Sequence, residues 1–281
     1  MENVFQDYKK NKKYLVCVDS DGCAIDSMDI KHYRCFGPCM VEEWNLSTWS
    51  DKILKRWNDI NLYTKTRGIN RFKGLSMALQ EINNQYIKIE DLKTLVNWVE
   101  TTNELSNASL QREIEKNQES ISLKKALSWS NSVNANIKKL PEEEILPFEK
   151  VKEALSFAHI DADVAIVSSA NLGAVLEEWK RHELLPHTDI VLAQNAGTKA
   201  YCIQELLKFG YDPKYVVMCG DALGDMDAAN KNNVNYFPIL VRHEKESWEE
   251  FINNGFNKLK EGTFSGSYQE ELINKFLKNL E

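Results

Sequence analysis

The sequence predicts an α/β fold in which a Rossmann-like parallel sheet carries an inserted block of helices. Two observations lead to this prediction. Short, continuously apolar segments alternate with amphipathic segments in the second half of the chain, which is typical of parallel strands covered by helices on both faces. Polar and acidic residues directly follow three of these apolar segments, and ligands of such folds bind beyond the carboxyl ends of the strands.

The composition is that of a globular protein with room for two domains. The chain has 281 residues, of which 43% are hydrophobic and 27% are charged. A net charge of −7 gives no reason to expect nucleic acid or an anionic membrane surface as a partner. No apolar run is long enough to span a bilayer, and the N-terminal sequence MENVFQDYKKNKK is too polar for a signal peptide, so we expect a cytoplasmic protein.

The six cysteines do not form the dense pattern of a small secreted scaffold. Cys35 and Cys39 could form half of a zinc site, but no second pair of Cys or His stands at zinc-finger spacing. Cys17 and Cys219 lie within apolar segments. We therefore interpret the cysteines as reduced, buried residues.

The first apolar segment, residues 14–18, leads directly into Asp19, Asp21 and Gly22. Carboxylates at the end of a buried strand are costly unless a metal ion or hydrogen bonds satisfy them. The segment therefore predicts a functional site at the carboxyl end of the first strand.

A block of helices follows the first strand. Between about residues 29 and 139, apolar residues recur with helical spacing and strand-like runs are almost lacking. One helix face is expected to carry Trp49, Ile53, Trp57 and Ile60, and a further helical segment is expected over residues 110–127. We predict a helical domain at 27–144, inserted into a core domain formed by 1–26 and 145–281.

Strands and helices alternate after this block. An amphipathic helix is expected to start at Pro147, with later helices at about 172–181 and 199–209. The predicted strands cover residues 164–167, 190–193, 215–219 and 236–241. The tail from Glu244 carries two more amphipathic helices, which we expect to pack onto the core, although a dimer contact would also fit; the protein could be a monomer or a homodimer.

The residues at the strand ends suit phosphoryl transfer. An aspartate such as Asp19 can act as a covalent nucleophile, and a carboxylate two residues on can protonate the leaving oxygen and later activate water. A cluster of carboxylates requires a cation, and oxygen ligands favour magnesium. Ser168 and Lys199 could supply the donors that meet the charge on the transferring phosphoryl group.

Four motifs resemble those of the haloacid dehalogenase superfamily. They are Asp-x-Asp-Gly-x-x-x-Asp-Ser at 19–27, a strand ending in Ser168, Lys199 at a helix start, and Gly-Asp-x-x-x-Asp at 220–225. The motifs occur in the family's order, each after its own strand, over about 150 residues of core. The helical block between the first two motifs resembles the C1-type cap of that family.

The resemblance implies catalytic roles for four residues. Asp19 would be the nucleophile and Asp21 the general acid and base. Ser168 and Lys199 would hold the phosphoryl group. The product of the first step would be an aspartyl-phosphate at Asp19.

The resemblance also implies a magnesium site. Asp19 and Asp221 would bind the metal, Asp21 would contribute its backbone carbonyl, and Asp225 would orient a metal-bound water or Lys199.

Substrate contacts are expected from two regions. Near the phosphoryl group, backbone amides at Gly22 and Ser169 and the side chain of Asn171 are candidates. In the helical block, Arg71 belongs to a basic stretch, residues 65–73, that resembles a substrate-reading loop of some relatives, although such a stretch could equally be a solvated helix start. Asp26 and Ser27 could cap the first helix of the block or contact substrate.

These implications favour a magnesium-dependent phosphatase that acts on a small phosphorylated metabolite through an aspartyl-phosphate. A phosphomutase of the beta-phosphoglucomutase type would use the same residues, and a non-catalytic phospho-acceptor module is a third possibility. A dehalogenase is disfavoured, because those relatives need no metal and lack an acid at the position of Asp21.

Overall fold

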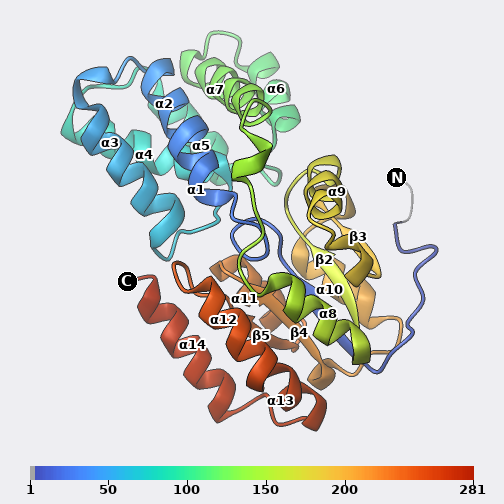
Figure 1. Ribbon diagram of the computed structural model, residues 1–281. Helices are drawn as coiled ribbons and strands as arrows, with labels where there is room; N and C mark the ends of the chain where they lie inside the picture. Colours follow the sequence, from blue (N-terminus) through green and yellow to red (C-terminus); the bar gives the residue numbers. More distant parts are fainter. Residues whose placement is uncertain (1–3) are drawn as a thin grey trace. The chain divides into compact units, whose positions relative to one another are not determined.

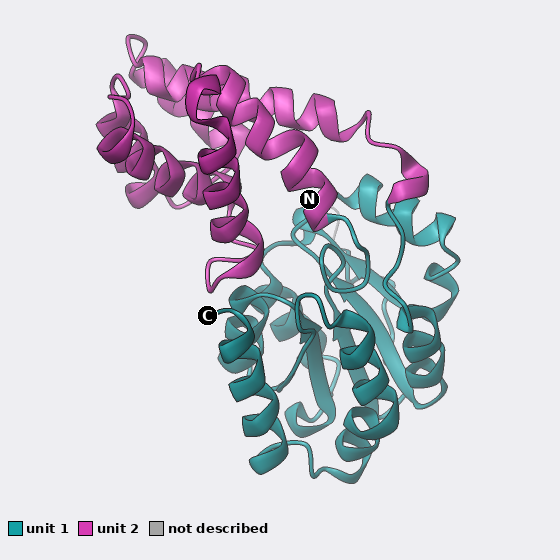
Figure 2. Cartoon of the chain, turned by 60° about the vertical axis from the view of Figure 1, so that its left-hand side comes forward, with its two compact units in different colours: residues 1–27, 145–281 teal, residues 28–144 magenta. Residues whose placement is uncertain are grey.

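The structure is a computed structural model that describes residues 4–281. The chain divides into two compact units (Figure 2). Unit 1 consists of the described part of residues 1–27 together with residues 145–281, and unit 2 consists of residues 28–144. The sequence analysis placed the helical block at 27–144, so its predicted start differs from that of unit 2 by one residue and its predicted end is the same.

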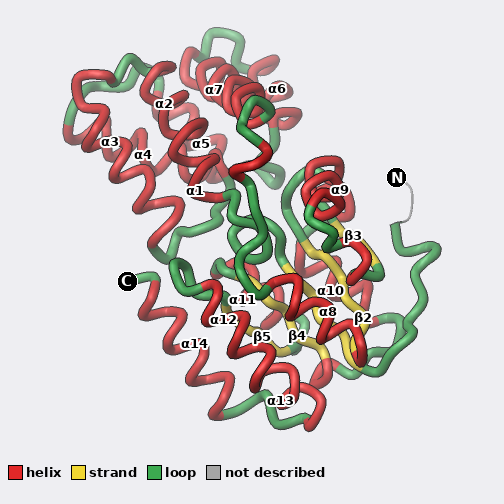
Figure 3. The backbone as a smooth tube through the Cα atoms, in the orientation of Figure 1, coloured by secondary structure: helices red, strands yellow, loops and turns green. Residues whose placement is uncertain are grey.

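Unit 1 is built on a fully parallel, five-stranded sheet with the order β3-β2-β1-β4-β5 (Figures 1 and 3). The strands are β1 (Tyr14–Val18), β2 (Ala162–Val167), β3 (Ile190–Leu192), β4 (Val216–Gly220) and β5 (Asn235–Pro238). Val18 of the central strand lies opposite Ile166 of β2 and Cys219 of β4. The parallel α/β class predicted from the sequence is confirmed.

Helices cover both faces of this sheet, so β1, β2, β4 and β5 are buried along almost their whole length. In Figure 1, α8, α12 and α13 lie over one face, and α10 and α11 lie over the other. The helices of unit 1 are α8 (Val151–Asp161), α9 (Leu172–Arg181), α10 (Lys199–Leu207), α11 (Leu223–Lys231), α12 (Glu244–Glu250), α13 (Phe256–Glu261) and α14 (Ser267–Asn279).

The C-terminal helices pack within unit 1, as predicted. Trp248 and Phe251 are buried, and so are Leu272, Phe276 and Leu280. The ring of Phe251 meets that of Phe237 edge-on, with centroids 5.2 Å apart. The tail therefore completes the apolar core of the α/β unit.

Unit 2 is all helical around an aromatic core. Its helices are α1 (Met28–Lys31), α2 (Gly37–Glu43), α3 (Ser50–Asn58), α4 (Arg71–Gln85), α5 (Leu92–Thr101), α6 (Asn107–Lys116) and α7 (Ile121–Ile137). Trp57 and Trp129 are fully buried with ring centroids 6.0 Å apart, and Phe72 packs edge-on against Trp98 at 5.2 Å. Within residues 4–281, no helix combines the length and apolarity needed to cross a membrane.

Several predicted element boundaries differ from the structure, and three of the differences have a clear cause. The helix expected over 110–127 is two helices, because Ser120 starts α7 by accepting a hydrogen bond from the Leu123 N–H at 3.4 Å. Pro147 does not start a helix; it pairs in extended conformation with the loop after β1, and α8 begins at Val151. The last strand stops at residue 238, since the next free N–H, that of residue 240, donates to a serine hydroxyl of α12.

Asp91 ties the start of α5 to the start of α7 in unit 2. Its backbone is left-handed, with φ of 54°, and its carboxylate accepts hydrogen bonds from the hydroxyls of Thr94, Ser120 and Ser122. The Ser122 hydroxyl also lies 2.6 Å from the Asp91 carbonyl oxygen, to which it can donate. Partial burial raises the pKa of Asp91, but the hydrogen bonds from Ser120, Thr94 and Ser122 outweigh burial, and the pKa is lowered overall.

The change Asp91→Ala is expected to lower the free energy of unfolding by about 1–3 kcal/mol, because several hydrogen bonds lose their acceptor. Asp91→Asn should cost less, since asparagine tolerates a left-handed backbone and keeps one acceptor oxygen. The folded-state pKa is depressed, so the advantage of wild type over Asp91→Asn is full above the unfolded-state pKa of about 3.9 and is lost as the pH falls through the folded-state value. Urea unfolding at several pH values measures this difference.

The control is Glu90→Gln, which removes one charge at the neighbouring exposed position. It should leave stability nearly unchanged at every pH. A difference between wild type and Asp91→Asn that does not shrink in acid would contradict the assigned role of the Asp91 carboxylate.

Candidate active site

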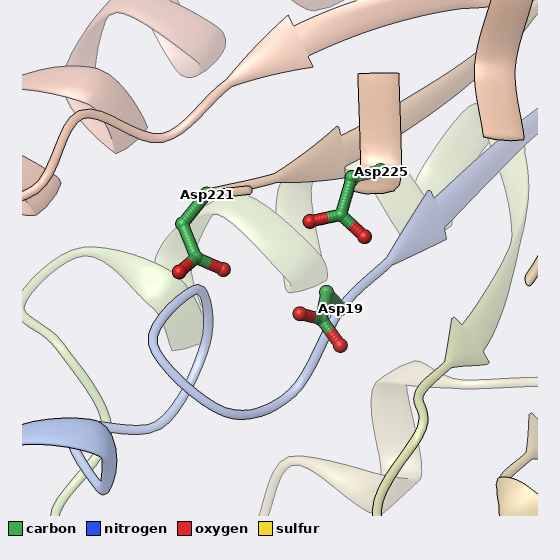
Figure 4. A group of neighbouring side chains, drawn as sticks. All are labelled: Asp19, Asp221 and Asp225. Atoms are coloured by element: carbon green, nitrogen blue, oxygen red, sulfur yellow. The ribbon is translucent and has the colours of Figure 1, made fainter. Parts of the chain in front are cut away.

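Three buried carboxylates meet at the carboxyl edge of the sheet (Figure 4). Asp19 directly follows β1, Asp221 directly follows β4, and Asp225 lies in the first turn of α11. Because β1 and β4 are neighbours in the sheet, their ends deliver these side chains to one place. One oxygen from each carboxylate lies within 4.8 Å of the others, and none of the three residues is more than 6% exposed.

Lys199 joins this cluster from the first residue of α10. Its ammonium lies 2.9 Å from Oδ2 of Asp19 and 2.5 Å from Oδ1 of Asp225. Thr198 holds the start of the helix, because its hydroxyl accepts a hydrogen bond from the Tyr201 N–H at 3.2 Å. The structure thus brings together Lys199, Asp19 and Asp225, which the sequence placed in separate motifs.

Burial and mutual repulsion act on the charges of the cluster. Burial raises the pKa of Asp19; Lys199 opposes this effect, Asp225 and Asp221 add to it, and the result lies well above the usual value. Burial lowers the pKa of Lys199, but Asp19 and Asp225 raise it by more, so the amine stays a cation. One cation among three carboxylates leaves a site that favours a further positive charge.

The two carboxylate oxygens of Asp225 make different contacts. Its Oδ2 accepts a hydrogen bond from the Ala222 N–H at 3.1 Å, which caps α11, and its Oδ1 contacts Lys199. Gly220 makes room for it: a Cβ at position 220 would lie 2.3 Å from Cγ of Asp225. The glycine before Asp221 is therefore required by close packing against the cluster.

The turn after Asp19 carries Asp21. Gly22 adopts φ of 80°, which favours glycine, and its N–H donates to the carbonyl of Ile25 at 2.8 Å. This N–H is thus already engaged within the turn. The hydroxyl of Ser27 donates to Oδ1 of Asp21, so Ser27 orients the predicted acid and base.

The second motif lies beside the first. Ser168 follows β2, the other neighbour of β1, is buried, and accepts a hydrogen bond from the Ala170 N–H at 3.1 Å. Ser169 is exposed. Asn171 caps α9, since its Oδ1 accepts from the N–H of Gly173 at 3.0 Å. The roles of Ser169 and Asn171 in substrate binding stay predictions.

Arg71 lies in unit 2, at the first residue of α4. Its Nη1 donates to Asn134 Oδ1 at 2.7 Å and to the Ser130 hydroxyl at 3.1 Å, and the guanidinium lies 5.0 Å from the ring centroid of Phe36. Burial lowers the pKa of Arg71. These contacts bind Arg71 to α7, and its contact with substrate stays a prediction.

The carboxylate cluster fits a hard divalent cation. Oxygen ligands at the end of parallel strands suit magnesium, and no sulfur or imidazole group is among them. Within the part of the chain that the structure describes, this is the sole group of acidic, His or Cys residues close enough to hold a metal. Cys35 and Cys39 are buried with free thiols, as expected for structural cysteines.

Three buried aromatic residues touch the site loops, and the sequence did not single them out. Trp179 Nε1 donates to the Ser20 hydroxyl at 2.9 Å, and Trp248 Nε1 donates to the Cys23 carbonyl at 3.1 Å. Tyr236 donates its hydroxyl to the Gly220 carbonyl at 2.8 Å. Each lies within a helix or strand that the sequence predicts, where apolar patterning indicates burial but not the partner of the polar atom.

Solved structures of other proteins share this fold. One, from Thermotoga maritima and provisionally described as a beta-phosphoglucomutase, aligns with a TM-score of 0.50 at 16% identity, over 88% of this chain and 99% of its own. Another, from Lactobacillus delbrueckii subsp. bulgaricus and provisionally described as a phosphoglycolate phosphatase, aligns with a TM-score of 0.50 at 14% identity, over 86% and 99% of the two chains. A search of curated proteins finds no match.

A family model gives the assignment that these distant structures cannot. The model of the haloacid dehalogenase-like hydrolases matches residues 90–239, just over half of the 281-residue chain. The matched segment carries Ser168, Lys199 and the motif at 220–225, while Asp19 lies before it and joins them in space through Lys199. The chain therefore belongs to the haloacid dehalogenase-like hydrolase family.

Proposed function

We propose that this hydrolase is a magnesium-dependent phosphatase that acts on a small phosphorylated metabolite through an aspartyl-phosphate. The observation that carries the proposal is the ion-paired cluster in which Lys199 contacts both Asp19 and Asp225, with Asp221 alongside. A nucleophilic carboxylate beside a fixed cation is what attack on a phosphate dianion requires, because the cation offsets repulsion between two anions.

Each residue has a defined part in the reaction. An oxygen of Asp19 forms a bond to phosphorus while the bond from phosphorus to the leaving oxygen breaks, and Asp21 gives its proton to that oxygen. Water then attacks the phosphorus of the aspartyl-phosphate as Asp21 takes the proton of the water, which restores Asp19 and releases inorganic phosphate. Lys199 and Ser168 hold the phosphoryl oxygens through both steps.

The metal would be held by the carboxylates of Asp19 and Asp221 and by the backbone carbonyl of Asp21. When bound, magnesium neutralises charge on the phosphoryl oxygens. Asp225 acts through Lys199, whose ammonium it fixes.

We also propose that unit 2 is the C1-type cap of this family and selects the substrate, with Arg71 among the contacts. A phosphomutase would use the same residues and return the phosphoryl group to a substrate hydroxyl rather than to water. A phospho-acceptor module would form the aspartyl-phosphate and stop there. The assays below separate these outcomes.

Phosphate release from a panel of sugar phosphates, nucleotides, phosphoglycolate and an aryl phosphate is expected to require magnesium and to fall by at least about 10³-fold in Asp19→Asn, since the variant lacks the nucleophile. A colorimetric phosphate assay with and without magnesium measures this. Release that survives in Asp19→Asn would rule out the covalent route; isomerised sugar phosphate in place of free phosphate would favour the mutase, and a stable phospho-protein the acceptor module.

Asp21→Asn is expected to lower kcat by about 10²–10⁴-fold on alkyl phosphates, because it removes the proton donor for a poor leaving group. The phenolate of an aryl phosphate is a good leaving group and needs little protonation to depart. Stopped-flow assays with this substrate should therefore show a burst of phenol followed by slow turnover, because Asp21 is still missing as the base for the second step. Equal loss of both phases would assign Asp21 a binding role instead.

Asp221→Asn should weaken magnesium binding at least about tenfold, since a charged ligand becomes neutral. Calorimetric titration with magnesium measures this in the absence of substrate. The matched control is Asp227→Asn, the same change at an exposed position of α11, the helix that follows Asp221. Equal magnesium affinity in wild type and Asp221→Asn would place the metal elsewhere.

A further inference from the structure

The loop that carries the two catalytic carboxylates is tightly hydrogen-bonded to itself. The carbonyl of Ser20 accepts the N–H groups of Ala24 and Ile25, each at 2.9 Å, and the N–H of Ser20 donates to Oδ1 of Asp19 at 2.8 Å. Ser20 is fully buried, and it lies between Asp19 and Asp21 in the sequence. Its position therefore sets the direction of Asp19 on one side and Asp21 on the other.

Trp179 holds Ser20 from α9. The indole is fully buried, and its N–H donates to the Ser20 hydroxyl at 2.9 Å. This helix follows β2 and Ser168 along the chain, so the bond joins the loop of the nucleophile to the helix after the predicted phosphoryl-binding serine.

Trp248 holds the same loop from α12. This indole is also fully buried, and its N–H donates to the Cys23 carbonyl at 3.1 Å. The thiol of Cys23 in turn lies 3.5 Å from the carbonyl of Cys219, next to the loop of Asp221. The C-terminal helices thus reach the catalytic loop through one directional contact.

We propose that Trp179 and Trp248 are positioning residues that hold the loop of residues 19–25 in the geometry that presents Asp19 and Asp21. In a water-free interior, an indole N–H and its acceptor fix each other, because no solvent can replace a lost partner. The catalytic consequence rests on the proposed phosphatase function, since a nucleophile displaced by about 1 Å can lose roughly 10²-fold in rate.

The variants Trp179→Phe and Trp248→Phe remove the N–H and keep an aromatic ring. Each is expected to lower kcat by about 10–100-fold with KM within about twofold, because the loop moves while the phosphoryl-binding residues stay. The matched control is Trp129→Phe in unit 2, where an equally buried indole donates to the Phe36 carbonyl at 3.1 Å. It should lower the unfolding temperature to a similar extent without changing kcat.

A double-mutant cycle tests the route through the serine. If Trp179 acts through the Ser20 hydroxyl, then Ser20→Ala and the double variant with Trp179→Phe should show the same kcat as Trp179→Phe alone. Additive losses would show that Trp179 acts by packing and would overturn its positioning role.

Hydrogen exchange measured by mass spectrometry gives a readout that needs no activity. Peptides covering residues 20–25 should exchange faster in both site variants than in wild type, while Trp129→Phe leaves them unchanged. Unchanged exchange in both site variants overturns the proposal, whatever the activity. Faster exchange in a protein that hydrolyses no phosphate ester would support the positioning of the loop and would contradict the phosphatase function alone.

Discussion

The ion pairs of Lys199 with Asp19 and Asp225 are the constraint on which the site depends. Three buried carboxylates repel one another, and each has lost most of its hydration. A lysine at 2.9 and 2.5 Å from two of them offsets part of this cost. Removing one partner of a buried pair leaves an uncompensated charge, so these ion pairs couple the start of α10 to the end of β1 and to the first turn of α11. The remaining negative charge would favour binding of a divalent cation at the site.

Strand order makes this convergence possible. With β1 between β2 and β4, Asp19 is flanked by the residues that follow both neighbours, Ser168 and Asp221. Close approach then imposes a local requirement at Gly220, because any side chain there would overlap Asp225. The motif glycine serves the packing of the carboxylates, whereas Gly22 serves a turn with positive φ. Two glycines of the site are thus required for different physical reasons.

The sequence predicted the first strand and the helix at 172–181 to the residue, because continuous apolar runs and helical periodicity are local signals. The meeting of Asp19 with Lys199 could also be anticipated, since parallel strands end at one edge. The break before Ser120 could not be anticipated, because the helical pattern of apolar residues continues on both sides of it and does not reveal the capping hydrogen bond of Ser120. The hydrogen-bond partners of Trp179 and Trp248 could not be anticipated either, since periodicity predicts that an indole is buried but not which acceptor its N–H contacts.

The apolar core and the loops of the candidate site are therefore parts of one arrangement. Trp248 packs edge-on against Phe251, with centroids 5.7 Å apart, while its N–H holds the loop after β1. Tyr236 packs against Phe276 at 5.6 Å, while its hydroxyl holds the end of β4 at Gly220. In both cases hydrophobic burial positions the aromatic ring, and the polar atom of the ring then holds one backbone carbonyl by a hydrogen bond. A rigid core of this kind lets the costly carboxylate cluster persist, because the loops cannot relax apart to relieve the repulsion.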